Sequence, residues 1–401
     1  MKKPRIHHSK PRSYRFCSNP ARKVTPFRFI PGWAIAWIAL FSIVDGLSAD
    51  ELNVWIGSSG DAGIHHVTLN TESGKMSGPK LAAEMNGAGF LAMHPNGGFL
   101  YSTAKQNREG GVAAFRIEPG ASPNLKKLNF ISTGDGGAAC VGVDKTGQVL
   151  MSAQYGGGST STYSINQDGS LGERIEVVEH GAGSGANPKR QKTSHPHWVG
   201  TSPDNRFLMV PDLGMDRVVV YELDSDTGKL TSHSKIAVPP GSGPRHMKFH
   251  TTGQFAYVLN ELTLTVSVFE YDATTAKFNN IQLIESLPDN LKGKRLDSAA
   301  EIRIHPSGNF VYTSNRGHDS ITVFSVNQET GKLKFVQRES IRGSWPRNFN
   351  IDPSGKWLIA AGANSNTLAL FRIDGASGKL EFTQNTVNVP SPICVLFENP
   401  R

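Results

Sequence analysis

A recurring strand-rich phrase limits what this chain can fold into more than any other feature of the sequence. The clearest copy, which ends at Asp272, reads GSGPRHMKFHTTGQFAYVLNELTLTVSVFEYD. Its alternating apolar residues, its β-branched and aromatic residues and its turn at Gly253 predict three successive β-strands. Further copies begin at His94, Asp144, Ser202, His305 and Asp352.

The spacing of the copies indicates how they are assembled. The residues two positions before each turn glycine, or its equivalent, are Pro95, Lys145, Pro203, Thr251, Pro306 and Pro353. The intervals between them are 50, 58, 48, 55 and 47 residues, and a GKL-type turn leads from the third strand into a fourth. Four strands in a period of this length are typical of a β-propeller blade. Because one four-stranded sheet buries too little apolar surface alone, the copies are expected to stack around an axis.

The two ends of the repeat region complement each other. The tail from Pro390, PSPICVLFEN, resembles a first strand, whereas LNVWIGSS from Leu52 and GIHHVTLN from Gly63 resemble second and third strands. We therefore predict an all-β, seven-bladed β-propeller over residues 50–401, with four-stranded antiparallel blades. The ring is expected to close where the N-terminal strands pair with the C-terminal strand.

Residues 1–49 have a different composition. Nine basic residues and no acidic residue precede Asp45, and the apolar run GWAIAWIALFSIV is followed by small residues. A basic segment, a short apolar segment and a small-residue exit are typical of a secretory signal peptide, which predicts a periplasmic or secreted protein. A retained N-terminal anchor is the alternative, and contact with a membrane is expected only in that case. The apolar run is short for a membrane span.

The basic segment also accounts for the net charge. Residues 1–49 hold nine of the 42 basic and one of the 34 acidic residues, which leaves 33 of each in the remainder. A domain with balanced charge gives no indication of nucleic-acid binding. Cys140 and Cys394 fall in equivalent apolar strands and are expected to be buried free thiols, because no pattern for a disulfide framework or a zinc site accompanies them.

Candidate site residues emerge where equivalent positions of the copies differ. First strands line the central channel of a propeller, and they begin at Gly89, Ala139, His197, Arg245, Ala300, Arg347 and Ile393. Second strands end at Ser58, Lys105, Tyr155, Leu213, Glu261, Arg316 and Ala363. In an antiparallel sheet these two sets lie at the same end, so both should surround one mouth of the channel. The polar members fall mainly in four successive blades.

This combination of side chains suits an anionic substrate. Arg245 and Arg316 could bind a carboxylate or phosphate and stabilise an oxyanion. His197 or Glu261 could activate water or transfer a proton, and the arginines would keep Glu261 ionised. The alternative is that these charges are solvated or paired structurally.

Other residues are expected to assist or to stabilise the fold. Further substrate contacts are predicted from Lys105, His195, His246, His318 and Arg347. His195 and His197 form an H-x-H pair, but no further ligand at a suitable spacing accompanies it, so neither a metal nor another cofactor is expected. Turn-stabilising roles are expected for His94, His250 and His305. The basic segment 187–194 is expected to be a solvated connection.

Several longer phrases resemble one known family. HPHWV, SPDNRFLMVPDLGMDRVVVY, GSGPRHMKFH, YVLNELTLTVSVF and AAEIRIHPSGNFVYTSNRGHDSI are similar to sequences of the seven-bladed propeller lactonases. That family includes cycloisomerase-type 6-phosphogluconolactonases and fungal carboxymuconate lactonizing enzymes. The resemblance spans roughly residues 52–398 and implies a metal-independent lactone site. By matching motifs, its members would be His197, Arg245, Glu261 and Arg316.

The resemblance implies lactone hydrolysis, with two alternatives. A secreted enzyme would not encounter 6-phosphogluconolactone, so a sugar-acid lactone or a similar small anionic lactone is the expected substrate. A lactonizing cycloisomerase would use the same acid–base groups to close the ring. A non-catalytic binding scaffold is the alternative from another class, because propellers host both. We expect a monomer.

Overall fold

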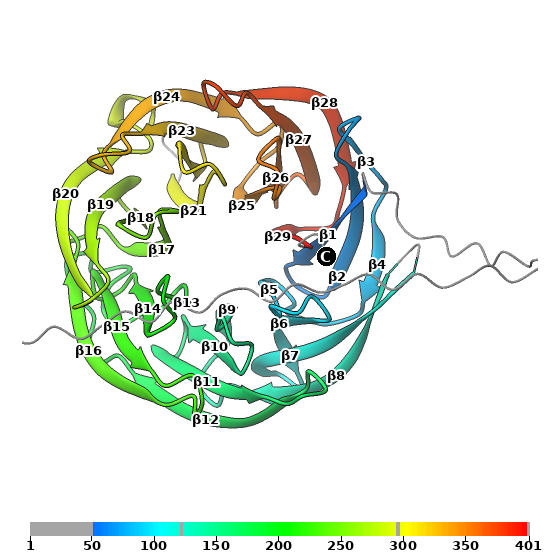
Figure 1. The fold of residues 1–401 in the computed structure, drawn as a ribbon, viewed down its shortest axis with the longest axis vertical. Coiled ribbons are helices and arrows are strands. Elements are labelled where there is room, and N and C mark those ends of the chain that lie inside the picture. The colour runs from blue at the N-terminus through cyan, green and yellow to red at the C-terminus, as the bar shows by residue number, and fades with distance from the viewer. Residues whose placement is uncertain (1–50, 121–122, 294–296, 399–401) are drawn as a thin grey trace, which may run out of the picture. The chain divides into compact units, whose positions relative to one another are not determined.

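The computed structural model describes residues 51–120, 123–293 and 297–398. The described residues belong to one compact unit. The predicted signal segment, residues 1–49, lies outside the described residues. Seven separate sheets surround a central axis within this unit, which confirms the predicted all-β, seven-bladed propeller (Figure 1).

The blades are numbered from the sheet that contains the N-terminal strands of the propeller. Blade 1 comprises β29 (Pro392–Phe397), β1 (Glu51–Ser58), β2 (Ile64–Asn70) and β3 (Lys75–Met76), with β4 (Lys80–Ala83) also paired to β2. Blade 2 comprises β5 (Leu91–Met93), β6 (Phe99–Gln106), β7 (Glu109–Glu118) and β8 (Asn124–Ser132). Blade 3 comprises β9 (Ala138–Val143), β10 (Val149–Gln154), β11 (Ser159–Ile165) and β12 (Leu171–Glu179).

The other four blades follow in chain order. Blade 4 comprises β13 (Gly200–Thr201), β14 (Phe207–Asp212), β15 (Arg217–Leu223) and β16 (Leu230–Ala237). Blade 5 comprises β17 (Pro244–Phe249), β18 (Phe255–Asn260), β19 (Thr265–Asp272) and β20 (Lys277–Glu285). Blade 6 comprises β21 (Ser298–Ile304), β22 (Phe310–Arg316), β23 (Ser320–Val326) and β24 (Leu333–Ser340). Blade 7 comprises β25 (Pro346–Ile351), β26 (Trp357–Gly362), β27 (Thr367–Ile373) and β28 (Leu380–Asn388).

The ring closes in blade 1 through strands from both ends of the propeller. β29 pairs antiparallel with β1, and the register places Val54 opposite Phe397 and Gly57 opposite Cys394. The first strand of this blade therefore comes from the C-terminal tail and the others come from the N-terminal side, as the sequence predicts. Figure 1 shows β29 beside β1.

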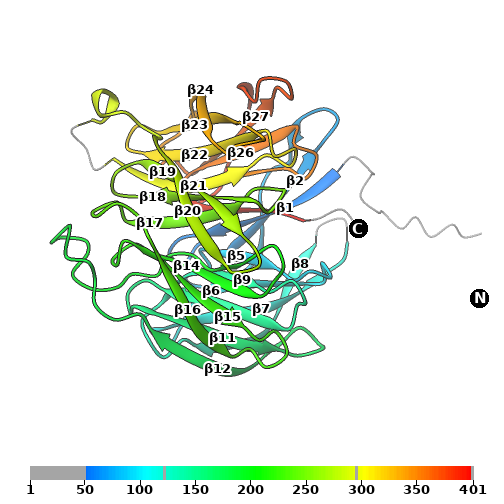
Figure 2. The same cartoon turned by 60° about the vertical axis from the view of Figure 1, so that its left-hand side comes forward.

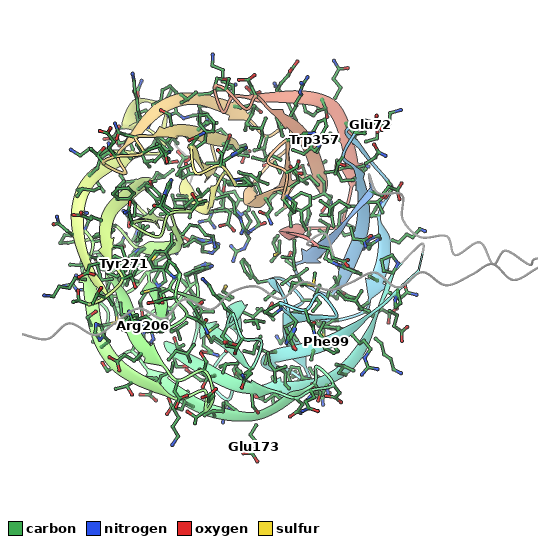
Figure 3. All side chains as sticks on the ribbon, in the orientation of Figure 1. Glu72, Phe99, Glu173, Arg206, Tyr271 and Trp357 are labelled. Carbon is green, nitrogen blue, oxygen red and sulfur yellow. The ribbon has the colours of Figure 1, made fainter. Side chains whose placement is uncertain are left out.

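Apolar packing and regular hydrogen bonds hold neighbouring blades together. In the core between blades 6 and 7, Tyr312 and Phe371 are fully buried. The hydroxyl of Tyr312 donates to the carbonyl of Gly378 at 2.8 Å, and Tyr101 and Tyr257 make equivalent bonds. Figure 2 shows the stacked sheets after a turn of 60°. In Figure 3, side chains fill the spaces between sheets, whereas the labelled Glu173 lies at the outer rim.

The structure confirms the turn-stabilising role predicted for three histidines. The Nε2 atoms of His94, His250 and His305 bond the carbonyls of Gly147, Gly308 and Gly355, one blade further on. Each of these histidines thus links its own turn to the turn of the next blade.

A shared irregularity at the start of the first strands positions residues of the channel. Between first and second strands the register shifts in five blades, which leaves one or two residues of the first strand without a direct partner. The bulged positions are Ala139, Arg245, Ala300 with Glu301, Arg347 and Ile393. A β-bulge redirects a side chain locally and often adjoins an active site. Apart from Glu301, these positions are five of the seven first-strand channel positions predicted from the repeat.

Helical structure is minimal in the part of the chain that the structure describes. It consists of the 3-10 turn η1 (Asp289–Leu291), so no helix among the described residues has the length and apolarity to cross a membrane. Cys140 and Cys394 are buried free thiols, as predicted. Burial raises the pKa of both thiols to about 12.

Candidate active site

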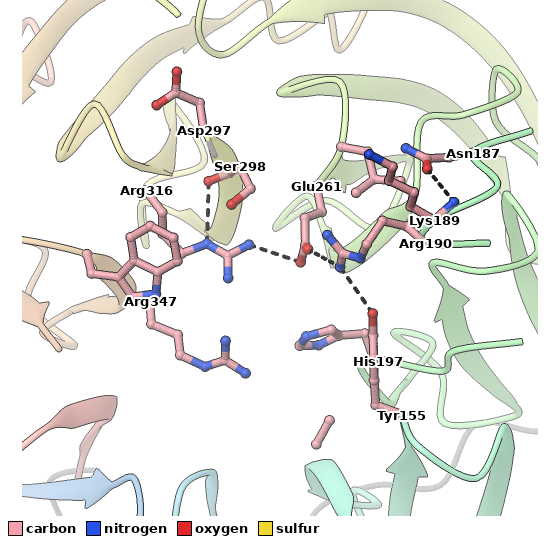
Figure 4. Close-up of a pocket in the computed structure, with 13 residues that line it drawn as sticks. Tyr155, Asn187, Lys189, Arg190, His197, Glu261, Asp297, Ser298, Arg316 and Arg347 are labelled. Atoms are coloured by element: carbon pink, nitrogen blue, oxygen red, sulfur yellow. Dashed lines mark hydrogen bonds and ion pairs between the residues drawn. The ribbon is translucent and has the colours of Figure 1, made fainter. Parts of the chain in front are cut away.

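A cavity of about 620 Å³ opens at the mouth of the channel that the repeat predicts. It is lined by Ala139, Tyr155, Asn187, Lys189, Arg190, His197, Glu261, Leu262, Asp297, Ser298, Arg316, Trp345 and Arg347. Figure 4 shows that the side chains of His197 and Arg347 point toward one another across this cavity. Three of the predicted first-strand positions and three of the predicted second-strand positions thus line one cavity: Ala139, His197, Arg347, Tyr155, Glu261 and Arg316.

A second cavity of about 200 Å³ adjoins the first. The two cavities share Ala139, His197 and Arg347 as lining residues. Arg245 and His246 line the smaller cavity on one side, and small residues such as Gly89 line it on the other. The site thus has a charged region and a narrower region with little side-chain bulk.

Glu261 stands at the centre of the charged region. Its Oε1 atom accepts from Arg190 Nη2 at 2.8 Å. Its Oε2 atom accepts from Arg245 Nε at 2.9 Å and lies 3.0 Å from Arg316 Nη2. One carboxylate therefore joins three guanidinium groups from three different parts of the chain.

The ionisation of this cluster follows from burial and charge. Burial would raise the pKa of Glu261, but Arg316, Arg245 and Arg190 together outweigh burial and lower it to about 2. Burial, with repulsion from Arg316 and Arg347, lowers the pKa of Arg245 to about 9. At neutral pH, Glu261 is therefore ionised and Arg245 remains a cation.

Arg347 differs from the other arginines of the site. No hydrogen bond or ion pair joins its guanidinium to any described residue, and the group lines both cavities. Burial, followed by repulsion from Arg316, lowers the pKa of Arg347. A guanidinium that is partly buried, faces a cavity and forms no ion pair with a carboxylate is suited to bind an anion.

His197 faces Arg347 as a neutral imidazole. Burial lowers the pKa of His197 well below 6.5, and the charges of Arg245, His246 and Arg347 lower it further. Its Nδ1 atom is buried and has no hydrogen-bond partner among the described residues, so Nε2 is the ring nitrogen available to the cavities. A neutral imidazole with one accessible nitrogen can accept a proton.

The segment that carries His197 is anchored by a buried carboxylate. Asp212 Oδ1 accepts from the backbone N–H of His195 at 2.7 Å, and Asp212 Oδ2 lies 2.9 Å from Nδ1 of His180. The His197 N–H donates to the carbonyl of Pro211. This segment pairs with β14 only through isolated backbone hydrogen bonds, because the regular strand β13 begins only at Gly200.

A second buried carboxylate, that of Glu301, holds Arg245 in place through His246. Glu301 Oε1 lies 3.0 Å from Nδ1 of His246, and His246 Nε2 lies 2.9 Å from Nη1 of Arg245. Because a guanidinium only donates, His246 accepts at Nε2 and carries its proton on Nδ1, which donates to Glu301. Burial lowers the pKa of His246 to about 3. His246 therefore orients Arg245 and also reaches the smaller cavity.

The basic segment 187–194 is not a solvated connection, and that prediction was wrong. Arg190 Nη2 bonds both Glu261 and the hydroxyl of Tyr155, the latter at 3.1 Å. Gln191 is fully buried, and its Nε2 atom donates to the carbonyl of Leu213 at 2.8 Å. Tertiary hydrogen bonds fold this loop over the mouth, where it forms one wall of the larger cavity.

Three predicted substrate contacts line neither cavity. His195 stacks on Tyr155 with ring centroids 4.5 Å apart, and its pair with His197 gains no third ligand among the described residues. His318 bonds the hydroxyl of Ser320 within its own turn. Lys105 is exposed and lines a separate depression. Among the predicted binding residues, the structure thus brings Arg347 and His246 to the site and leaves these three outside it.

Comparisons with known proteins place this geometry in a family. Residues 53–397 match the family model described as "Lactonase, 7-bladed beta-propeller". The 6-phosphogluconolactonase of Bacillus subtilis (strain 168) is 38% identical over 341 residues, which cover 84% of this chain and 95% of that protein. A protein of the same name from Formosa agariphila is 36% identical over 312 residues, which cover 74% and 86%.

A solved structure extends the likeness to three dimensions. The periplasmic gluconolactonase of Pseudomonas aeruginosa superimposes with a TM-score of 0.81 and 29% identity, over 87% of this chain and 99% of that chain. The chain therefore belongs to the family of lactonases with a seven-bladed β-propeller fold.

Proposed function

We propose that this protein opens the lactone ring of a sugar acid or a similar small anion by adding water. The observation that carries the proposal is the neutral imidazole of His197, which faces the unpaired guanidinium of Arg347 across a cavity of about 620 Å³. A base for water and a cation for developing negative charge are the two groups that ester hydrolysis requires. The names of the relatives support the same chemistry.

The reaction can be written with the residues of the site. His197 Nε2 accepts a proton from water while the water oxygen bonds to the lactone carbonyl carbon, and the carbonyl π electrons move to its oxygen. Arg347 and Arg316 stabilise the resulting oxyanion. When the carbonyl re-forms, the bond to the ring oxygen breaks and the His197 imidazolium returns its proton to that oxygen. The product is the open hydroxy acid.

Glu261 serves in this scheme as an ionised anchor. Its pKa of about 2 leaves no proton to donate near neutrality, and both oxygens already bond arginines. No hydrogen bond between Glu261 and His197 exists in the described structure, so it is the arginines that Glu261 orients. We assign it the role of holding Arg245 and Arg316 in place for the negative charge that develops on the lactone.

The cell compartment favours an unphosphorylated substrate. The basic and apolar segment before residue 50 is typical of export, and the similar structure from Pseudomonas aeruginosa is named a periplasmic gluconolactonase. We place this protein in the periplasm or outside the cell. Its substrate would then be a sugar-acid lactone that occurs there, with the phosphorylated lactone as the comparison compound.

The test is proton release from δ-gluconolactone and from its 6-phosphate by the purified protein, measured above the spontaneous rate. We expect turnover that persists in EDTA and prefers the unphosphorylated lactone. Consumption of carboxymuconate without lactone hydrolysis would instead identify a lactonizing enzyme. The absence of turnover on a panel of sugar lactones, together with tight binding of a sugar or peptide, would identify a binding scaffold and end the proposal.

A further inference from the structure

One turn position recurs in the propeller and carries different side chains. Between the second and third strands, Asp216, Leu264, Asp319 and Asn366 all have a positive φ of 55 to 57°. In each case the backbone carbonyl accepts an N–H from the loop that enters the next blade. The left-handed conformation is uncommon for residues other than glycine, although Asn and Asp adopt it more readily than most.

At three of these positions the side chain also bonds that loop. Asp216 accepts from the N–H groups of Gly241 and Gly243, both at 2.8 Å. Asp319 Oδ1 accepts from the N–H of Trp345 at 2.7 Å. Asn366 Oδ1 accepts from the N–H of Ser391 at 2.8 Å. Each bond fixes the last residues before a bulged first strand.

The carboxylates occur where the next strand carries an arginine. The loop bonded by Asp216 leads directly into Arg245, and the loop bonded by Asp319 leads into Arg347. Asn366 precedes the strand with Ile393 instead. Charged acceptors make stronger hydrogen bonds than neutral ones, so the stiffer anchors serve the two arginine strands.

Asp216 also fixes the loop that carries Arg190. The side chain of Asp216 is 1% exposed and accepts from Gln191 Nε2 at 2.7 Å and from Ser184 Oγ at 2.8 Å. One buried carboxylate therefore accepts four hydrogen bonds and connects the loop of Arg190 to the loop of Arg245. Both of those arginines pair with Glu261.

Asp319 acts on a strained residue. Trp345, which receives its hydrogen bond, has a φ of 66°, a conformation that is a genuine outlier for a bulky side chain. The Trp345 ring lies 5.4 Å from the Arg316 guanidinium carbon, and its carbonyl accepts from the N–H of Arg347. Strained backbone at a functional site persists only where neighbouring groups hold it.

We propose that Asp216 and Asp319 are positioning residues of the lactone site, which fix the loops of Arg190, Arg245 and Arg347 without touching the substrate. The assignment rests on the proposed function. The two aspartates have different roles. Asp216 positions the arginines that pair with Glu261, whereas Asp319 positions the guanidinium of Arg347, which lies opposite His197.

The experiment replaces each anchor by glycine, which removes the acceptor and keeps the left-handed turn accessible. Asp216→Gly is expected to lower kcat/KM by about 100-fold, because displacements near 1 Å cost that much. Asp319→Gly is expected to lower kcat by about tenfold with little change in KM, because it loosens Arg347, which stabilises the oxyanion of the transition state. The matched control Asn366→Gly, which serves the strand without an arginine, should keep wild-type kinetics.

Conservative variants and a second measurement separate positioning from general stability. Asp319→Asn retains the single acceptor and should restore kcat, whereas Asp216→Asn can keep only part of four bonds and should remain impaired. Hydrogen exchange should accelerate over residues 241–245 in Asp216→Gly and over residues 345–347 in Asp319→Gly. A purely structural role would lower the melting temperature of all three glycine variants alike and leave kcat and KM unchanged.

The outcomes that overturn the inference are distinct from failure of the proposed function. If Asp216→Gly and Asp319→Gly perturb kcat/KM no more than Asn366→Gly, the positioning role is wrong. If the wild-type protein hydrolyses no lactone, the proposed function is wrong. The same comparison is then made with the affinity for 6-phosphogluconate, measured by calorimetry. Equal affinity in all three glycine variants would reject the positioning role in that case as well.

Discussion

The two halves of the channel mouth share the same β-bulge but carry side chains of different character on it. In blades 5 and 7, the bulge at the start of the first strand carries Arg245 and Arg347. In blades 3 and 1, the equivalent bulge carries Ala139 and Ile393. The repeat thus supplies the direction in which a side chain points, and a few substitutions supply the chemistry. In the proposed function, the half with the arginines binds the substrate and carries out the reaction, whereas the other half provides space for the substrate.

The small side chains of the second half are also required by packing. A Cβ atom added at Gly89 would lie 2.7 Å from Cδ1 of Ile393. The narrow cavity of about 200 Å³ therefore depends on the absence of bulk on this side. The contrast between the halves can be tested by removing groups from the charged half and by adding volume to the small half.

Removal of the base should have the largest effect. His197→Ala is expected to lower kcat/KM by about 1,000-fold, because general base catalysis contributes roughly 100- to 10,000-fold. The measurement is proton release from δ-gluconolactone. His195→Ala is the matched control, since His195 lies two residues away and lines neither cavity; comparable losses in the two variants would contradict the assignment.

Removal of the unpaired cation should have the next largest effect. Arg347→Ala is expected to lower kcat/KM by about 100-fold, as for loss of one donor to an oxyanion. Arg347→Lys keeps the charge but loses the planar fork, so it should recover only part of the activity. Wild-type kinetics in Arg347→Ala would assign the oxyanion to other groups.

Filling the small half should have a moderate effect. Ala139 borders both cavities, so Ala139→Leu is expected to lower kcat/KM by about tenfold through steric exclusion. Lys105→Ala, at the surface of the same half, should change nothing. Steady-state kinetics of both variants check this, and unchanged activity in Ala139→Leu would mean that the substrate occupies only the charged half.

The smallest effect concerns pH. Because the pKa of His197 lies well below 6.5, kcat/KM should stay constant from about pH 8 down to pH 6.5 and fall only at lower pH, as the imidazole gains a proton. A fall that begins at or above pH 6.5 would contradict a desolvated imidazole. The pH–rate profile provides the measurement.

Stability should depend on Glu261 in a lower pH window. Its folded pKa of about 2 lies below the ordinary value of 4.5, so its contribution to stability is complete above pH 4.5 and is lost as the pH falls toward 2. Thermal unfolding against pH should show this loss in the wild-type protein. The loss should be smaller in Glu261→Gln, which cannot titrate there.

Much of the fold could be predicted because the blade repeats. The period, the closure by the tail from Pro390 and the channel positions of Arg245 and Arg347 all follow from equivalent residues in successive copies. What the period does not encode is the path of an irregular loop. Arg190 enters the site because buried groups, among them Gln191 and Asp216, hold its loop, and these contacts join residues far apart in the repeat.

Lys105 and His318 lie outside the cavities for a similar physical reason. Lys105 occupies the same repeat position as Arg316, but β6 continues into a tight hairpin in which Lys105 pairs with Gly110. Its side chain is exposed as a result. His318 lies next to the site in sequence but bonds within its own turn. Small differences in the turn decide whether a side chain enters the channel.

The closure of blade 1 has a consequence for biosynthesis. β1 is made near the start of the propeller, yet the partner that completes its sheet, β29, is made more than three hundred residues later. Asn350, in the same strand of blade 7 as Arg347, also bonds the carbonyl of Val395 in β29. A nascent chain therefore carries an open edge beside its future active face until synthesis reaches Phe397. Activity should appear abruptly with the last strand rather than grow blade by blade.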